Sequence, residues 1–200
     1  MKIGIYVGSF NPPHLGHLKV INYLLENNYV DKVIVIPTGN YWDKQDLIDI
    51  KHRINMLKFY ENDKVIINDE LNNIPYTYQV LDLLSKKYPN DNLQLIIGDD
   101  NLPKFHLWKN YQEILKYQVI VLKRNDINTF DTIAYQDNRK QFILIENFPK
   151  VNISSTIIRD YLNEKNSNVI KYLNPNVLNY IIDNNLYNIR DTKRFIKKKI

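Results

Sequence analysis

Two histidines near the N-terminus, His14 and His17, are the residues whose type and spacing best suit chemistry. They lie three residues apart in the stretch Gly8-Ser9-Phe10-Asn11-Pro12-Pro13-His14-Leu15-Gly16-His17, and this spacing places two side chains on one face of a helix. A helix start offers unpaired N–H groups and the positive end of the helix dipole, so it suits a phosphate. Two imidazoles beside these groups add hydrogen-bond donors that are neutral or cationic near neutral pH. The stretch therefore predicts a phosphate-binding loop that leads into a helix.

Strands and helices that could position this loop alternate along the chain. Apolar runs predict strands over 2–7, 31–37, 64–67, 93–98, 119–122 and 142–145. Apolar residues at helical spacing predict helices over 18–25, 45–61, 74–84, 154–162 and 175–185, and helical pieces broken by Pro103 over 102–115. This alternation is typical of an α/β fold, so we expect a Rossmann-like open parallel sheet flanked by helices. We expect one domain over 1–187, whose C-terminal helices from about 154 pack on the sheet, and a basic tail over 188–200.

Scarce glycines mark one edge of the expected sheet. Only five glycines occur, and four lie where an expected strand hands over to a loop or helix: Gly8, Gly16, Gly39 and Gly98. Ligands of open parallel sheets bind at the carboxyl ends of the strands. We therefore expect the functional site at this edge.

Composition excludes several classes of site and partner. The chain has no cysteine, which excludes disulfides, thiolate metal sites and a thiol nucleophile. The two histidines lack a third histidine or cysteine at metal-ligand spacing, so we expect no protein metal site. The last eleven residues hold six of the 27 basic and one of the 22 acidic side chains, so the net charge of +5 belongs to the tail. We interpret the tail as a solvated chain end, so its charge does not indicate a nucleic-acid partner. Because no apolar run could span a bilayer or serve as a signal peptide, we expect a cytoplasmic protein without a membrane partner.

A second motif adds a further phosphate-binding element. The segment Ile153-Ser154-Ser155-Thr156-Ile157-Ile158-Arg159 offers a helix N-cap, then a hydroxyl and a guanidinium three residues apart and off the apolar stripe of the expected helix. Together with the stretch 8–17, this segment resembles the nucleotidyltransferase superfamily with the HxGH signature. The segments 74–82, 95–102 and 108–111 narrow the resemblance to bacterial nicotinate-nucleotide adenylyltransferases. This sequence differs from the usual family pattern at Asn11, where the family commonly has Asp, and at Asp99, where it usually has a small residue.

The resemblance implies a reaction between ATP and nicotinate mononucleotide. The 5′-phosphate of the mononucleotide attacks the α-phosphorus of ATP in line, without a covalent intermediate, and gives nicotinate adenine dinucleotide and pyrophosphate in NAD biosynthesis. A phosphate monoester has a second pKa of about 6 and is already an anion near pH 7, so no general base is required. The protein must hold two polyanions in line and stabilise the charge that builds during transfer. Mg²⁺ would be bound mainly through the ATP phosphates.

The resemblance also assigns roles to the residues of the two motifs. The catalytic residues would be His14, His17 and Arg159. The ATP-binding residues would be Gly8, Ser9, Phe10, His14, Gly16, His17, Gly98, Asp100, Ser155, Thr156 and Arg159. Of these, Asp100 would accept hydrogen bonds from the ATP ribose.

The mononucleotide would be bound by Lys44, Thr77 and Trp108. Trp108 would stack on the pyridine ring, and Thr77 with nearby N–H groups would meet the ring carboxylate. Arg53 and Arg124 are further candidates for a phosphate. We interpret Asp99 as a helix cap.

Several alternatives stay open at this point. Phosphopantetheine adenylyltransferases share the HxGH signature, although their chains are usually shorter. Nicotinamide mononucleotide differs from the nicotinate substrate only by a carboxamide in place of the carboxylate. A non-catalytic nucleotide-sensing module would use the same fold, and a homo-oligomer is also compatible with the sequence.

Overall fold

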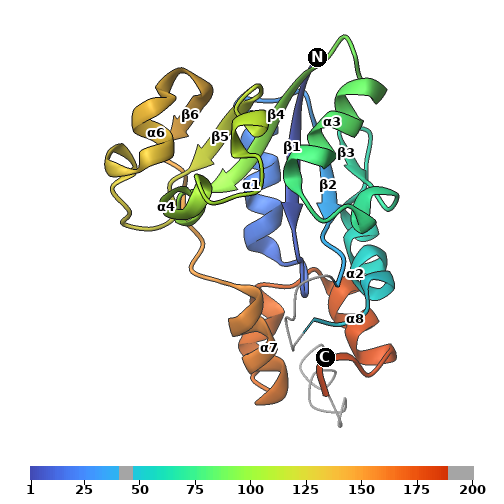
Figure 1. Cartoon of the computed structure of the whole chain (residues 1–200). Coiled ribbons are helices and arrows are strands. Elements are labelled where there is room, and N and C mark those ends of the chain that lie inside the picture. The colour runs from blue at the N-terminus through green and yellow to red at the C-terminus, as the bar shows by residue number, and fades with distance from the viewer. Residues whose placement is uncertain (41–46, 189–200) are drawn as a thin grey trace.

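Six strands form one sheet in the computed structural model, which describes residues 1–40 and 47–188. The strands are β1 (Lys2–Gly8), β2 (Lys32–Pro37), β3 (Val65–Ile67), β4 (Asn92–Gly98), β5 (Gln118–Leu122) and β6 (Phe142–Ile145). They are parallel and lie in the order β3-β2-β1-β4-β5-β6 (Figure 1). The predicted Rossmann-like parallel sheet is confirmed. Lys44 and the basic tail from residue 189 onward lie outside the described residues.

Helices connect the strands, and their bounds follow from local chemistry. They are α1 (Leu15–Glu26), α2 (Ile50–Leu57), α3 (Thr77–Lys87), α4 (Leu102–Phe105), α5 (Tyr111–Ile114), α6 (Ile133–Asp137), α7 (Ser155–Asn163) and α8 (Pro175–Asp183). The predicted break at Pro103 is wrong, because this proline lies in the first turn of α4, where a missing N–H costs nothing. The interruption spans residues 106–110 and ends at Asn110, which has a left-handed φ of 50°. The helix expected from 45 begins only at Ile50, after Asp49 accepts a hydrogen bond from the Lys51 N–H.

Both faces of the sheet are buried, as a parallel sheet requires. Side chains of β1 and β2 alternate between the faces: Ile5 packs with residues of α3, and Tyr6 packs with residues of α1. The two resulting cores fix the strands, so that their carboxyl ends meet at one edge. The loops that carry both motifs leave from this edge.

The C-terminal helices α7 and α8 lie beyond the carboxyl ends of the strands (Figure 1). Their apolar side chains share a third core with α2, which includes Met56, Ile158, Leu162, Val177 and Ile181. The buried members of this core come from helices and the turns beside them, whereas the sequence led us to expect packing on the sheet itself. The arrangement brings the second motif, at the start of α7, opposite the loop that follows β1.

Candidate active site

The two histidines of the first motif cap helix α1 with one ring nitrogen each. His14 is the N-cap residue, and its Nδ1 accepts a hydrogen bond from the Gly16 N–H at 3.0 Å. The Nδ1 of His17 accepts in turn from the His14 N–H at 3.1 Å. A neutral imidazole carries one donor and one acceptor nitrogen, so the proton of each ring lies on Nε2. Each histidine therefore presents an Nε2–H donor beside the helix start.

The surroundings keep both rings neutral. Burial, and then the positive charge of Arg124, lower the pKa of His14 to about 4. Burial, followed by the charges of His14 and Arg124, lowers the pKa of His17 well below its usual range. The rings stack with centroids 3.8 Å apart, so two adjacent positive charges would repel. In this structure, without a bound anion, both rings are therefore neutral, and each can donate only through Nε2.

Gly16 makes this stacked arrangement sterically feasible. A Cβ at this position would lie 2.8 Å from the His14 ring and 3.1 Å from a side-chain carbon of Ile153. Such distances are too short for an ordinary carbon contact. The glycine therefore lets the His14 ring fold back over the helix start. It would also allow a phosphate to approach the backbone closely.

The second motif holds the loop after β1 through its carbonyl groups. Arg159 Nη1 donates to the Asn11 carbonyl at 2.9 Å, and Ser155 Oγ donates to the Pro12 carbonyl at 2.9 Å. Arg159 Nη2 also donates to Thr156 Oγ1 at 3.3 Å. The structure thus brings the predicted residues of both motifs together, with the second motif clamping the first. Arg159 keeps further N–H groups, because a guanidinium carries five.

Two other side chains complete the support of this loop. Arg53 is fully buried and donates to the carbonyls of Ser9 at 2.7 Å and Ile48 at 3.1 Å, and to Asn40 Oδ1 at 2.8 Å. Burial lowers its pKa to about 10. The structure gives Arg53 a supporting role in place of the expected phosphate contact, because its side chain is buried and each of its three nitrogens donates to a protein acceptor.

Tyr187 is a supporting residue that the sequence did not reveal. Its hydroxyl donates to Asn11 Oδ1 at 2.8 Å, from a turn 176 positions further along the chain. Burial raises its pKa. Asn11 itself is buried, so this departure from the usual Asp takes part in the loop's packing.

A cavity of about 780 Å³ opens beside the first motif, at the carboxyl ends of β1 and β4. The predicted site residues that line it are Gly8, Ser9, Phe10, His17, Thr77, Gly98, Asp100 and Trp108. The Phe10 ring is buried and packs edge-on against Tyr6 and His17, so only the Phe10 backbone is available to a ligand. One cavity therefore joins residues predicted for ATP with residues predicted for the mononucleotide.

The far part of this cavity suits an aromatic acid. Trp108 packs against Phe105 with ring centroids 5.0 Å apart while it faces the cavity. Thr77 begins α3, and the N-cap residue Tyr76 makes no side-chain capping hydrogen bond. The Gln79 N–H donates to the Tyr76 carbonyl at 3.1 Å, so the N–H groups before it, at Thr77 and Tyr78, are the ones that this helix start can offer to an anion.

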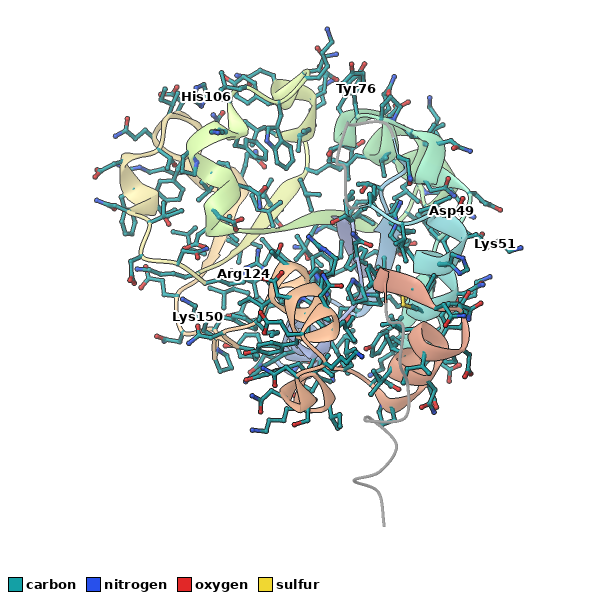
Figure 2. All side chains as sticks on the ribbon, turned by 90° about the horizontal axis from the view of Figure 1, so that it is seen from below. Asp49, Lys51, Tyr76, His106, Arg124 and Lys150 are labelled. Atoms are coloured by element: carbon teal, nitrogen blue, oxygen red, sulfur yellow. The ribbon has the colours of Figure 1, made fainter. Side chains whose placement is uncertain are left out.

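A second cavity of about 380 Å³ lies on the other side of His14. Ser154 at the start of α7, Arg124 and Lys150 line it together with His14 and Gly16. Figure 2 views this edge from below and shows Arg124 and Lys150 on the same side of the molecule. Among the described residues, Asp100 is the one carboxylate that lines this cavity, and it faces two cations and the positive end of the α7 dipole, so the cavity is suitable for a polyphosphate.

Arg124 borders both cavities and is a more central residue than the sequence indicated. Its guanidinium pairs with Asp100 at 3.2 Å and lies against Gly98, where any Cβ would collide with the guanidinium. The available signal was its position, two residues after the end of a parallel strand. Asp99 is buried and accepts N–H groups of residues 124 and 125, so the interpretation of Asp99 as a helix cap is wrong.

Within 1–40 and 47–188, no group of three or more His, Cys, Asp and Glu side chains could hold a metal ion. Over the same residues, no helix is both long and apolar enough to cross a membrane.

Comparisons with known proteins agree with this geometry. The family model described as cytidylyltransferase-like matches residues 5–161. A protein of Flavobacterium psychrophilum named "Probable nicotinate-nucleotide adenylyltransferase" is 39% identical over 195 residues, which cover 94% of this chain and 99% of the relative. A protein of the same name from Borreliella burgdorferi is 39% identical over 201 residues, which cover 94% and 97%.

A solved structure shares the fold. The Plasmodium falciparum nicotinic acid mononucleotide adenylyltransferase complexed with NaAD superposes with a TM-score of 0.78 at 24% identity, over 94% of this chain and 98% of that one. From its motifs, its fold and these relatives, the chain belongs to the nicotinate-nucleotide adenylyltransferase family.

Proposed function

We propose that this chain transfers the adenylyl group of ATP to nicotinate mononucleotide and releases pyrophosphate. The observation that carries the proposal is the pair of Nε2–H donors of His14 and His17 at a helix start, set between two cavities. One cavity offers an aromatic ring and the start of α3, and the other offers cations. This division fits a substrate with a pyridine carboxylate and a co-substrate with a polyphosphate.

The mononucleotide is placed with its ring at Trp108 and its carboxylate at the start of α3. An aromatic side chain contributes stacking area there, and the N–H groups around Thr77 favour a carboxylate over a neutral carboxamide. The 5′-phosphate then points toward the start of α1. It attacks as a dianion and needs no base from the protein.

The polyphosphate of ATP is placed across the start of α1 and into the second cavity. The two Nε2–H groups donate to oxygens of the transferring phosphate, where negative charge is redistributed as the bond to the leaving pyrophosphate breaks. Arg124, Lys150 and the remaining N–H groups of Arg159 stabilise the leaving pyrophosphate. The histidines, Arg124 and Arg159 are held by protein contacts before the substrates arrive, which reduces the reorganisation that accompanies the reaction.

Mg²⁺ is proposed to enter as the complex with ATP. Mg²⁺ keeps several waters and is commonly held by substrate phosphates, so the donor set of the described residues, which lacks a metal cluster, is compatible with it. Its chemistry is to neutralise phosphate charge. We also propose that the enzyme acts in the cytoplasm, where ATP is available.

Pyrophosphate release tests the proposal directly. The protein would be incubated with ATP and Mg²⁺ and, in parallel, with nicotinate mononucleotide, nicotinamide mononucleotide or phosphopantetheine. We expect rapid release with the nicotinate compound only. Release mainly with the amide would contradict the role of the α3 start, and release with none of the three while ATP still binds would favour a nucleotide-sensing module.

A further inference from the structure

Asp99 is a fully buried carboxylate whose hydrogen bonds go to one short segment of chain. Its Oδ1 accepts from the Arg124 N–H at 3.1 Å and from Asn125 Nδ2 at 2.9 Å. Its Oδ2 accepts from the Asn125 N–H at 3.0 Å. All of these donors belong to the two residues 124 and 125, which follow β5 after Lys123.

A buried charge is costly unless its oxygens are well satisfied. Here the donors are neutral N–H groups, and the salt bridges found within residues 1–40 and 47–188 do not include Asp99. Hydrogen bonds to an ionised acceptor are stronger than neutral ones. The carboxylate therefore fixes the backbone of residues 124 and 125 more firmly than a small apolar residue could.

The fixed segment is the one that carries the Arg124 side chain. The guanidinium pairs with Asp100, the next residue after Asp99, at 3.2 Å and lies against Gly98. The Arg124 side chain is 35% exposed and borders both cavities. Three consecutive residues thus act on Arg124: Gly98 leaves space for its guanidinium, Asp99 holds its backbone, and Asp100 pairs with its charge.

We propose that Asp99 is a positioning residue that sets Arg124 in place for the phosphates of ATP. The role rests on the proposed adenylyl transfer and adds to it a residue that does not touch substrate. A long, flexible arginine loses conformational entropy when it binds an anion. Anchoring its backbone at Asp99 and its guanidinium at Asp100 removes part of this cost before ATP arrives.

A double-mutant cycle separates positioning from a merely structural role. Asp99→Ala, Arg124→Ala and the double variant would be assayed for pyrophosphate release with nicotinate mononucleotide, and kcat and KM for ATP would be measured separately. Asn68→Ala is the matched control. Asn68 is also buried and also accepts two backbone N–H groups after a strand, at 3.1 and 2.9 Å, and it lies outside the residues assigned to the site.

We expect Asp99→Ala to raise KM for ATP about 10-fold, as loss of one charge-assisted hydrogen bond does. In the Arg124→Ala background the same change should have little further effect, because Asp99 then has no arginine side chain left to position. Asp99→Asn retains one oxygen that can accept from residue 124 but lacks the charge and the second acceptor, so it should raise KM for ATP by less than Asp99→Ala does, yet measurably. It also keeps the test available if Asp99→Ala does not fold. Asn68→Ala should lower the midpoint of thermal unfolding and leave KM for ATP unchanged.

Two results would overturn the proposal. One is an Asp99→Ala protein with a lowered unfolding midpoint but wild-type KM for ATP. The other is a double variant in which the two effects on KM multiply. Failure of the adenylyl-transfer assignment is a distinct outcome, because the unaltered protein would then release no pyrophosphate with the nicotinate substrate.

Discussion

The two nitrogens of each motif histidine have separate tasks, and this separation can be tested. Nδ1 accepts a backbone N–H and so supports the start of α1, whereas Nε2–H is left to donate to a phosphate. An asparagine side chain places its amide oxygen close to the position of Nδ1 and has nothing at the position of Nε2. His14→Asn and His17→Asn should therefore keep the helix cap and lose the donor.

The structure allows the two effects to be estimated. Asparagine is among the best N-cap residues, so His14→Asn should change the free energy of unfolding by less than about 1 kcal/mol, while His14→Ala should cost about 1 kcal/mol or more. Removal of one donor that stabilises a transition state lowers kcat by about 100- to 1000-fold. That loss corresponds to about 3 to 4 kcal/mol in the activation free energy.

Pyrophosphate release under saturating substrates, together with urea unfolding, would measure both quantities. His52→Asn is the matched control, because His52 also uses Nδ1, in a contact with Tyr180 at 2.9 Å, but lies on α2. It should retain wild-type kcat. If His14→Asn and His17→Asn both keep kcat within about threefold, the Nε2–H donors are not used and the reasoning fails. Nitrogen NMR of the rings that showed protonated Nδ1 atoms at pH 7 would refute it at an earlier step.

Three further predictions concern stability and the arrangement of the site. The pKa of His14 falls from 6.5 to about 4 on folding, so the unfolded state binds more protons than the folded state between pH 4 and pH 6.5. The free energy of unfolding should therefore be constant above pH 6.5 with respect to this group and should fall by up to about 3 kcal/mol as the pH drops to 4. Urea unfolding over this pH range would measure the loss. Arg53→Lys should lower the free energy of unfolding by about 2 to 3 kcal/mol, because one ammonium cannot serve the Ser9 carbonyl and the two other acceptors of the guanidinium fork; an unchanged urea midpoint would contradict this. Gly98→Ala should displace the Arg124 side chain and lower kcat/KM for ATP about 10-fold while the thermal midpoint changes little, and a wild-type kcat/KM would show that Arg124 is not needed there.

Most of the fold could be predicted because its signals are local. The strands of the parallel sheet are buried on both faces and read as short continuous apolar runs, such as 33–36 and 119–122. The first motif could be placed at a strand end because Gly8 and His14 flank it within a few residues. Two helix boundaries were predicted wrongly. The start of α2 is set by the cap at Asp49, and Pro103 is tolerated because it lies in the first turn of α4. Neither feature changes the apolar pattern from which the helices were predicted.

The supporting contacts of the site could not be predicted, because they join residues distant in the chain. Arg53 was read as a phosphate ligand since its charge is visible in the sequence, but the carbonyl groups that occupy it are not. Tyr187 lies 176 positions from Asn11, and its distance in sequence gives no hint of the hydrogen bond. A side chain that binds backbone leaves no residue-type signature in its partner.

The same reasoning explains why Asp99 looked unimportant and why the site needs it. Residues that meet a ligand are recognisable by type, since histidine, arginine and a helix start suit phosphate whatever surrounds them. Residues that position those groups are recognisable only from the fold. Asp99 holds the backbone of Arg124, and Gly16 leaves room for the ring of His14. Arg53 fixes the loop after β1 through the Ser9 carbonyl. Transition-state stabilisation by neutral imidazoles is modest unless the donors are fixed in direction before the substrate binds. The buried groups of this site therefore contribute to the rate by orienting the groups that bind phosphate, and not by touching the substrate themselves. Substitutions among them should change KM and kcat without removing any atom that touches ATP.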